Sequence, residues 1–209
     1  MRERFTGRIA GVGSRSGVRV VVGRWDAGPW GPFADVMVED AAGHRVLVAP
    51  DERTRPFVSA TYSFDEVVIA PVAVTDTAAG WRVVSGPLAL DLTVGGPTPV
   101  GLQLRLVPGR LATSPAWCTL ADPVARVVMR GVRTRGTAGQ ERREWYGATS
   151  VRAVTDLHGT WRGQDLGALR LVDPPCRFGF SSTPRRPCVT DVVTTIERTA
   201  DRDDEARPE

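Results

Sequence analysis

The sequence predicts a mainly β protein, α+β at most, folded as an antiparallel β-barrel or a two-layer sandwich of about ten strands with two short helices. Three observations support this class. Valine and leucine alternate with smaller or polar residues in many short segments, and turn sequences separate those segments. No GxGxxG motif opens a helix after a strand, and the mixed pattern excludes a Rossmann-type βαβ series.

The first fifty residues are typical of a strand meander. Strands are expected at residues 5–12, 18–25, 33–40 and 45–49, joined by short turns. A short helix is expected within residues 51–62, because Pro56 suits a first helical turn. The segment that follows, residues 64–74, is apolar on both faces, which predicts a central strand.

The clearest local signal is a hairpin. Residues 88–94 and residues 100–106 each alternate between apolar and more polar positions, and GGPTP separates the two runs. A second helix is expected at residues 122–130, with Asp122 as its cap and Pro123 in its first position. Further strands are expected at residues 144–148, 151–157, 169–172, 177–181 and 189–197. Residues 1–199 are therefore interpreted as one globular domain, and the acidic residues 200–209 as a disordered tail.

The composition excludes several kinds of chemistry. The chain has 209 residues and a net charge of +3, and all 27 of its basic side chains are arginine. Without lysine there is no Schiff base, no pyridoxal phosphate aldimine and no P-loop lysine. No signal peptide or membrane span is expected, and three cysteines are an odd number, so we expect reduced thiols and a cytoplasmic location.

Four stretches together resemble a known family. They are GRWDAGPWGPFADVMVED, ATYSFDEVVIAPV, REWYGA and FGFSSTPRRP. In these stretches the chain is similar to a family of uncharacterised proteins from G+C-rich actinobacterial genomes. The resemblance covers most of residues 1–199 and implies a cytoplasmic, actinobacterial protein, but it implies no activity and assigns no functional residue.

The candidate catalytic residues are His158 and Asp156. On a strand, two residues spaced by two point to the same face, so the carboxylate could fix the imidazole tautomer and make a general base. The alternative is a turn histidine that bonds its neighbours. Cys188 is a weaker candidate nucleophile because Arg185 and Arg186 precede it, and its alternative is a small buried apolar residue.

The candidate ligand-binding residues are aromatic and basic. Trp25, Trp30 and Trp161 lie next to glycine, proline or turn residues, where they could line a pocket at a barrel mouth or plug its core. Arg185 and Arg186 could grip a carboxylate or phosphate, or could simply be solvated. A second basic cluster comprises Arg126, Arg130, Arg133 and Arg135.

Three functional hypotheses remain open. The first is a non-catalytic module that binds a small, partly apolar ligand, with an acidic group on the ligand as an option. The second is a cofactor-independent enzyme that uses His158 and Asp156 for acid–base chemistry. The third is an arginine-mediated protein or RNA interaction module, although nucleic acid is not favoured as a partner. No cofactor and no metal site are expected, and the oligomeric state is left open.

Overall fold

A computed structural model describes residues 2–128, 132–138, 142–179 and 181–198. Its strands are β1 (Arg2–Ser14), β2 (Arg19–Ala27), β3 (Phe33–Glu39), β4 (Arg45–Ala49), β5 (Glu66–Ile69), β6 (Ala73–Asp76), β7 (Gly80–Val84), β8 (Leu88–Pro97), β9 (Arg135–Ala138), β10 (Arg142–Trp161), β11 (Gln164–Asp165), β12 (Leu169–Arg170) and β13 (Cys188–Arg198). Its helices are α1 (Thr54–Ser59), α2 (Pro99–Leu104), α3 (Gly109–Ala112) and α4 (Pro115–Val128).

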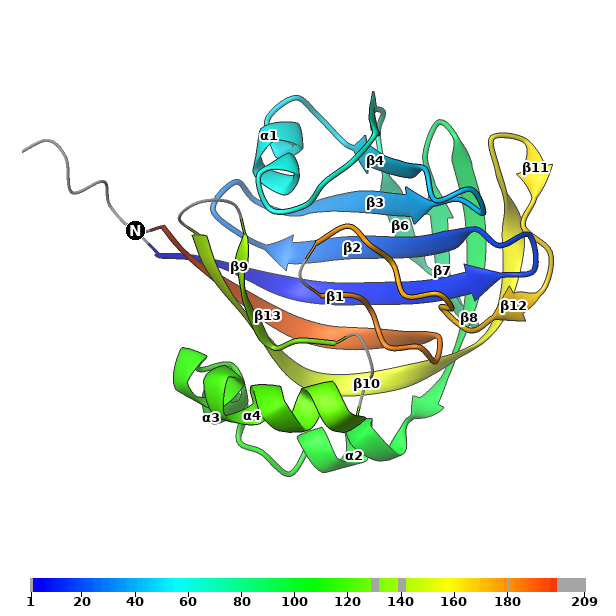
Figure 1. Cartoon of the computed structure of the whole chain (residues 1–209). Coiled ribbons are helices and arrows are strands. Elements are labelled where there is room, and N and C mark those ends of the chain that lie inside the picture. Colours follow the sequence, from blue (N-terminus) through cyan, green and yellow to red (C-terminus); the bar gives the residue numbers. More distant parts are fainter. Residues whose placement is uncertain (1, 129–131, 139–141, 180, 199–209) are drawn as a thin grey trace, which may run out of the picture.

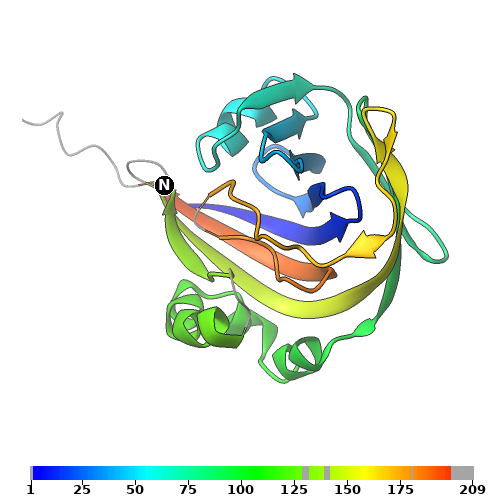
Figure 2. The ribbon, with the colours of Figure 1, turned by 45° about the vertical axis from the view of Figure 1, so that its right-hand side comes forward.

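The strands form one curled, mixed sheet, so the prediction of a mostly β fold is confirmed. Ten strands follow the order β5-β4-β3-β2-β1-β13-β10-β8-β7-β6, and the sheet wraps into a half-barrel (Figures 1 and 2). Among the described residues, the strands pair antiparallel except for β4 with β5, which are parallel. A single curled sheet replaces the alternative of a two-layer sandwich.

The segment predicted as a central strand, residues 64–74, lies instead at the two edges of the sheet. It is divided into β5, which pairs with β4, and β6, which pairs with β7. Pro71 lies between them and has no N–H to donate to a ladder, which explains the break. Residues 70–72 therefore carry the chain from one edge of the half-barrel to the other.

The period-two pattern places one set of side chains on the inner face of the curl. From β2 and β3, the buried cluster there includes Val20, Val22, Val36 and Val38. From β7 and β8, it includes Trp81, Leu88, Leu90 and Leu92. The interior is thus filled by the alternating residues that predicted the strands.

One strand prediction and one helix prediction need correction. The predicted strand at residues 100–106 is helix α2, because Thr98 accepts a hydrogen bond from the Gly101 N–H and Pro99 occupies the first turn. The helix predicted at residues 122–130 begins at Pro115, where the Ser114 hydroxyl accepts from the Trp117 N–H. Asp122 therefore lies inside helix α4 and does not cap it, and residues 129–130 lie outside the described part.

Within the described residues, four short helices thus replace the expected two. The short helix predicted within residues 51–62 is confirmed as α1, and helices α2, α3 and α4 pack beside β10 (Figure 1). In the described part of the chain, no helix combines the length and apolar character that crossing a membrane requires. The expected tail, residues 200–209, lies outside the described residues.

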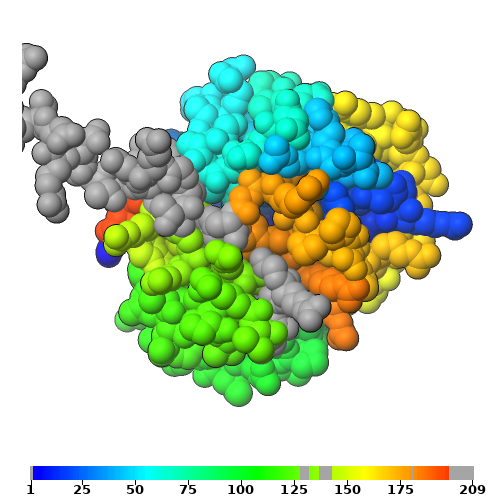
Figure 3. Space-filling view, in the orientation of Figure 1, coloured from blue at the N-terminus to red at the C-terminus, as the bar shows by residue number. Residues whose placement is uncertain are grey.

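The outer face of the sheet, opposite the inner cluster, is covered by a second layer of chain. This layer consists of α1 with residues 60–64, and of a covering loop, residues 171–187 apart from residue 180. In Figure 3 the orange atoms of the covering loop lie between the cyan atoms around α1 and the green helices. The described residues of the predicted strand at 177–181 belong to this loop and form no strand.

Candidate functional site

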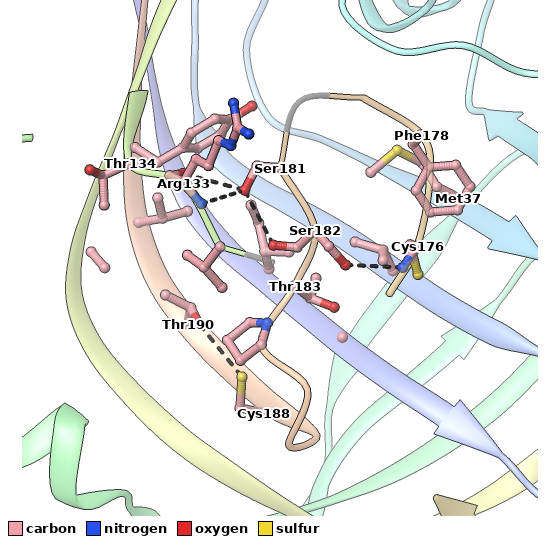
Figure 4. A pocket seen from close by; sticks show the side chains of 18 of the residues that line it. Met37, Arg133, Thr134, Cys176, Phe178, Ser181, Ser182, Thr183, Cys188 and Thr190 are labelled. Atoms are coloured by element: carbon pink, nitrogen blue, oxygen red, sulfur yellow. Dashed lines mark hydrogen bonds between the residues drawn. The ribbon is translucent and has the colours of Figure 1, made fainter. Parts of the chain in front are cut away.

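A cavity lies between the outer face of the sheet and the covering loop (Figure 4). Its volume is about 120 Å³, counted as the space open to the centre of a water molecule. Alternating strand residues make the floor, and we call the space the apolar lobe because aliphatic side chains dominate it. The floor includes Ile9, Val21, Met37, Ala148, Cys188 and Val192.

The covering loop forms the roof and is fastened by side-chain hydrogen bonds. Ser182 Oγ accepts from the Cys176 N–H at 3.1 Å, and Ser181 Oγ accepts from the Arg133 N–H at 3.0 Å. Thr183 rests directly on the sheet at Gly11, where an added Cβ would lie 2.4 Å from the threonine side chain. A side chain at position 11 would therefore push the roof away from the floor.

A buried ion pair anchors the same loop to the sheet. Glu39 is fully buried, and its carboxylate lies 3.0 Å from the guanidinium of Arg19, which is 5% exposed. The same carboxylate accepts from the backbone N–H of Arg177 at 2.7 Å and from Arg177 Nε at 3.0 Å. Glu39 thus neutralises a buried arginine and holds the loop in place.

A second, smaller space adjoins the apolar lobe, and we call it the acid lobe because Asp35 and Glu144 line it. Its volume is about 50 Å³ on the same measure. Five residues line both lobes, namely Ile9, Val21, Met37, Tyr62 and Tyr146. The two lobes therefore lie side by side on the outer face of the sheet.

Two tyrosines and a glutamate form a hydrogen-bonded chain where the lobes meet. Tyr146 Oη donates to Glu144 Oε2 at 2.8 Å, and Thr61 Oγ1 donates to Glu144 Oε1 at 2.8 Å. Tyr62 Oη and Tyr146 Oη are hydrogen-bonded to each other. Because Tyr146 donates its single hydroxyl proton to Glu144, Tyr62 is the donor in the hydrogen bond between the two tyrosines. Burial, together with the charge of Glu144, raises the pKa of both tyrosines.

Asp35 is the second carboxylate of the acid lobe. It is 4% exposed, and Trp25 Nε1 donates to its Oδ1 at 3.0 Å. Burial raises the pKa of Asp35 to about 6, and the tryptophan hydrogen bond opposes that rise. An acid in this position exchanges its proton close to physiological pH.

The three candidate tryptophans do not share one site. Trp25 lines the acid lobe. Trp30 is 41% exposed and packs edge-on against Phe57, with ring centroids 4.6 Å apart, at the end of the aromatic cluster around Phe5. Trp161 is buried in the inner cluster of the curl, on the face of the sheet opposite the lobes.

The candidate arginines do not line either lobe. Arg185 pairs with Asp173 at 2.6 Å, and both side chains are about half exposed. Arg186 is exposed at the same turn. Among the described residues, the basic side chain that lines the apolar lobe is Arg133.

The candidate catalytic pair does meet, as its spacing on a strand predicts. His158 Nε2 lies 3.0 Å from Asp156 Oδ2 on β10. The two side chains are 80% and 52% exposed, and neither lines the apolar lobe or the acid lobe. The structure therefore places this pair in solvent, away from the cavity.

All three cysteines are free and buried. Cys176 and Cys188 both line the apolar lobe, which agrees with the interpretation of Cys188 as a small buried residue. Burial raises the pKa of the Cys188 thiol to about 11, so its thiolate is disfavoured.

A groove on the surface gathers arginines from four segments. Arg126, Arg133, Arg135 and Arg143 line it together with Glu144 and Trp145, and its volume is about 500 Å³. Arg133 also lines the apolar lobe and Glu144 the acid lobe, so the groove borders both. Three of these arginines belong to the second basic cluster of the sequence, while its fourth member, Arg130, lies outside the described residues. Arg126 is paired with Asp122 at 2.6 Å.

No protein-family model, no curated protein and no solved structure matches the chain. The resemblance to an actinobacterial family therefore stays a prediction. The candidate site depends on the geometry of this chain alone.

Proposed function

We propose that the protein is a non-catalytic module that binds a small, partly apolar molecule in the cavity beneath the covering loop. One observation carries the proposal: an apolar lobe of about 120 Å³ adjoins a lobe lined by two buried carboxylates and two hydrogen-bonded tyrosines. Binding sites for small molecules are concave and mostly apolar, with a few convergent polar groups. A void that served only packing would lose contacts and stability without compensation.

Filling the apolar lobe should abolish binding. Ala148 lies on its floor, and leucine at that position adds three carbon atoms to the empty space. Toluene is the probe, because it is apolar and close in size to the lobe. We expect toluene to raise the Tm of the wild type, and we expect Ala148→Leu to raise the Tm without toluene, through a gain of about 0.5–2 kcal/mol, and to remove the toluene response.

The matched control is Ala89→Leu, on the exposed face of β8. It adds the same side chain away from the cavity and should respond to toluene like the wild type. An equal toluene response in Ala148→Leu and Ala89→Leu, measured by differential scanning calorimetry, would contradict the proposal.

A second candidate function is the binding of an anionic partner in the arginine groove. The observation in its favour is that four arginines line one groove with Trp145 and a single carboxylate, Glu144. Guanidinium groups bind phosphates and carboxylates in a bidentate manner, and an indole can stack on a base. This corresponds to the hypothesis of an arginine-mediated protein or RNA interaction module.

Retention on a heparin column tests this second function. If the groove binds polyanions, the double variant Arg135→Gln/Arg143→Gln should elute at a clearly lower salt concentration than the wild type. The control double variant Arg53→Gln/Arg55→Gln removes two exposed arginines around α1 and should elute like the wild type. Elution of all three proteins at the same low salt concentration would exclude the polyanion function.

A further inference from the structure

We propose that the ligand of the cavity is a small apolar amine, whose ammonium group binds in the acid lobe while its apolar body fills the apolar lobe. This inference depends on the proposed function, because it requires that the cavity binds a ligand. It adds the chemical class of that ligand, which comes from the polar groups that the acid lobe presents.

The acid lobe presents a buried carboxylate. Asp35 lines it, and the described residues of its lining include no arginine and no histidine. Lysine is absent from the whole chain. Burial disfavours an uncompensated carboxylate at Asp35. A positively charged group that enters the lobe would therefore stabilise the ionised form of Asp35.

The hydrogen-bonding pattern also favours a donor on the ligand. Tyr62 donates its single proton to Tyr146, so its oxygen has only lone pairs left for a ligand. An ionised Asp35 is an acceptor and no donor. An ammonium group brings up to three N–H donors and matches these acceptors, whereas a carboxylate would face the lone pairs of Tyr62 and the charge of Asp35.

Thr194 provides an independent indication that a polar ligand group belongs in the lobe. It lines the acid lobe and is 4% exposed, and its hydroxyl has no hydrogen-bond partner among the described residues. A buried hydroxyl without a partner costs free energy. A ligand N–H that reaches Thr194 Oγ1 would remove that cost.

Aromatic rings complete the lining of the acid lobe. Trp25, Phe33 and Phe57 belong to it, and the Trp25 and Phe33 rings pack with centroids 6.2 Å apart. Aromatic faces attract organic cations, and carboxylates combined with rings are a common lining for ammonium groups. The apolar lobe beside it is close in size to a cavity that admits benzene, about 150 Å³.

Three probes that share one ring test the inference: benzylamine, toluene and benzoate. Their dissociation constants are measured by ligand-observed NMR near neutral pH, where benzylamine is cationic and benzoate is anionic. We expect benzylamine to bind about tenfold more tightly than toluene, the gain typical of a charge-assisted hydrogen bond, and benzoate to bind more weakly than either. Asp35→Asn should remove most of the benzylamine advantage and leave toluene binding unchanged.

Two further variants make the result specific. Asp91→Asn removes the same charge from an exposed pair with Arg82 and should retain the benzylamine advantage. Thr194→Val should weaken benzylamine binding severalfold and should not weaken toluene binding.

The outcomes separate the inference from the proposed function. Toluene binding without any benzylamine advantage would overturn the amine and leave the cavity as a binding site. Tighter binding of benzoate would also overturn it and would assign recognition to Arg133, which lines the apolar lobe. Absence of binding by all three probes would overturn both proposals.

Discussion

Replacing Glu39 with alanine is expected to lower the free energy of unfolding by about 3–5 kcal/mol, the range measured when one partner of a buried ion pair is removed. Glu39 is fully buried, and Arg19 beside it is 5% exposed. Without the carboxylate, Arg19 keeps its charge and a single backbone acceptor, the carbonyl of Asp40. The backbone N–H of Arg177 also loses its acceptor.

The same substitution should loosen the covering loop, because Glu39 is its anchor on the sheet. We therefore expect Glu39→Ala to lose the toluene response as well as stability. Urea denaturation measures the first effect. Glu52→Ala is the control, since Glu52 forms an exposed pair with Arg55 and its loss should cost less than about 0.5 kcal/mol. A loss below about 1 kcal/mol in Glu39→Ala would show that the pair does not hold the loop.

Replacing Asp35 with asparagine is expected to raise the free energy of unfolding at alkaline pH by up to about 3 kcal/mol. Burial raises the pKa of Asp35 from 3.8 to about 6. Between these two pH values the folded state therefore keeps a proton that the unfolded state has released. Ionising Asp35 in the fold costs free energy that ionisation in the unfolded chain does not cost. An amide in its place accepts the same hydrogen bond from Trp25 and carries no charge.

The sign of the pH dependence follows from this raised pKa. Below pH 3.8 Asp35 is protonated in both states, so wild type and variant differ little. As the pH rises from 3.8 through about 6, the wild type loses stability relative to the variant, and above this window the difference is complete. Urea denaturation across this window, with Asp91→Asn as the control, measures it. A variant that is less stable than the wild type above the window, or a constant difference, would contradict the assignment.

Much of the fold could be predicted because the strands alternate strictly. Val20 and Val22, like Val36 and Val38, lie in the inner cluster as period two requires. The same period wrongly predicted a strand at residues 100–106, where the chain forms α2 and Leu102 is 53% exposed. The Thr98–Pro99 pair, a cap followed by a first-turn proline, was the sequence signal for that helix.

The candidate site could not be predicted, because its residues come from distant segments. Asp35 on β3, Thr194 on β13 and Glu144 on β10 share one face through the sheet order β3-β2-β1-β13-β10, and Tyr62 joins them from the segment after α1. Alternation marks Asp35 as facing away from the inner cluster, which in a single-layer sheet means solvent. The second layer of chain buries that face instead, and no local pattern in the sequence predicts such a layer.

The enzyme hypothesis has less geometric support than the binding hypothesis. His158 and Asp156 form the predicted pair, but both are exposed and lie outside the cavity. A catalytic pair works best where water is excluded and a substrate is held. Among the described residues, the groups with raised pKa that face the cavity are Asp35, Tyr62, Tyr146, Cys176 and Cys188.

The most direct test of the cavity uses the methyl group of Met37. This residue lines both lobes, and the chain contains only three methionines, so a methyl-labelled sample gives few signals. Met37→Leu assigns the Met37 signal by its disappearance. The structure predicts that toluene shifts this signal and gives nuclear Overhauser effects to it, and that Ala148→Leu abolishes both. A Met37 signal that ignores toluene while other parts of the protein respond would contradict a binding cavity beneath the covering loop.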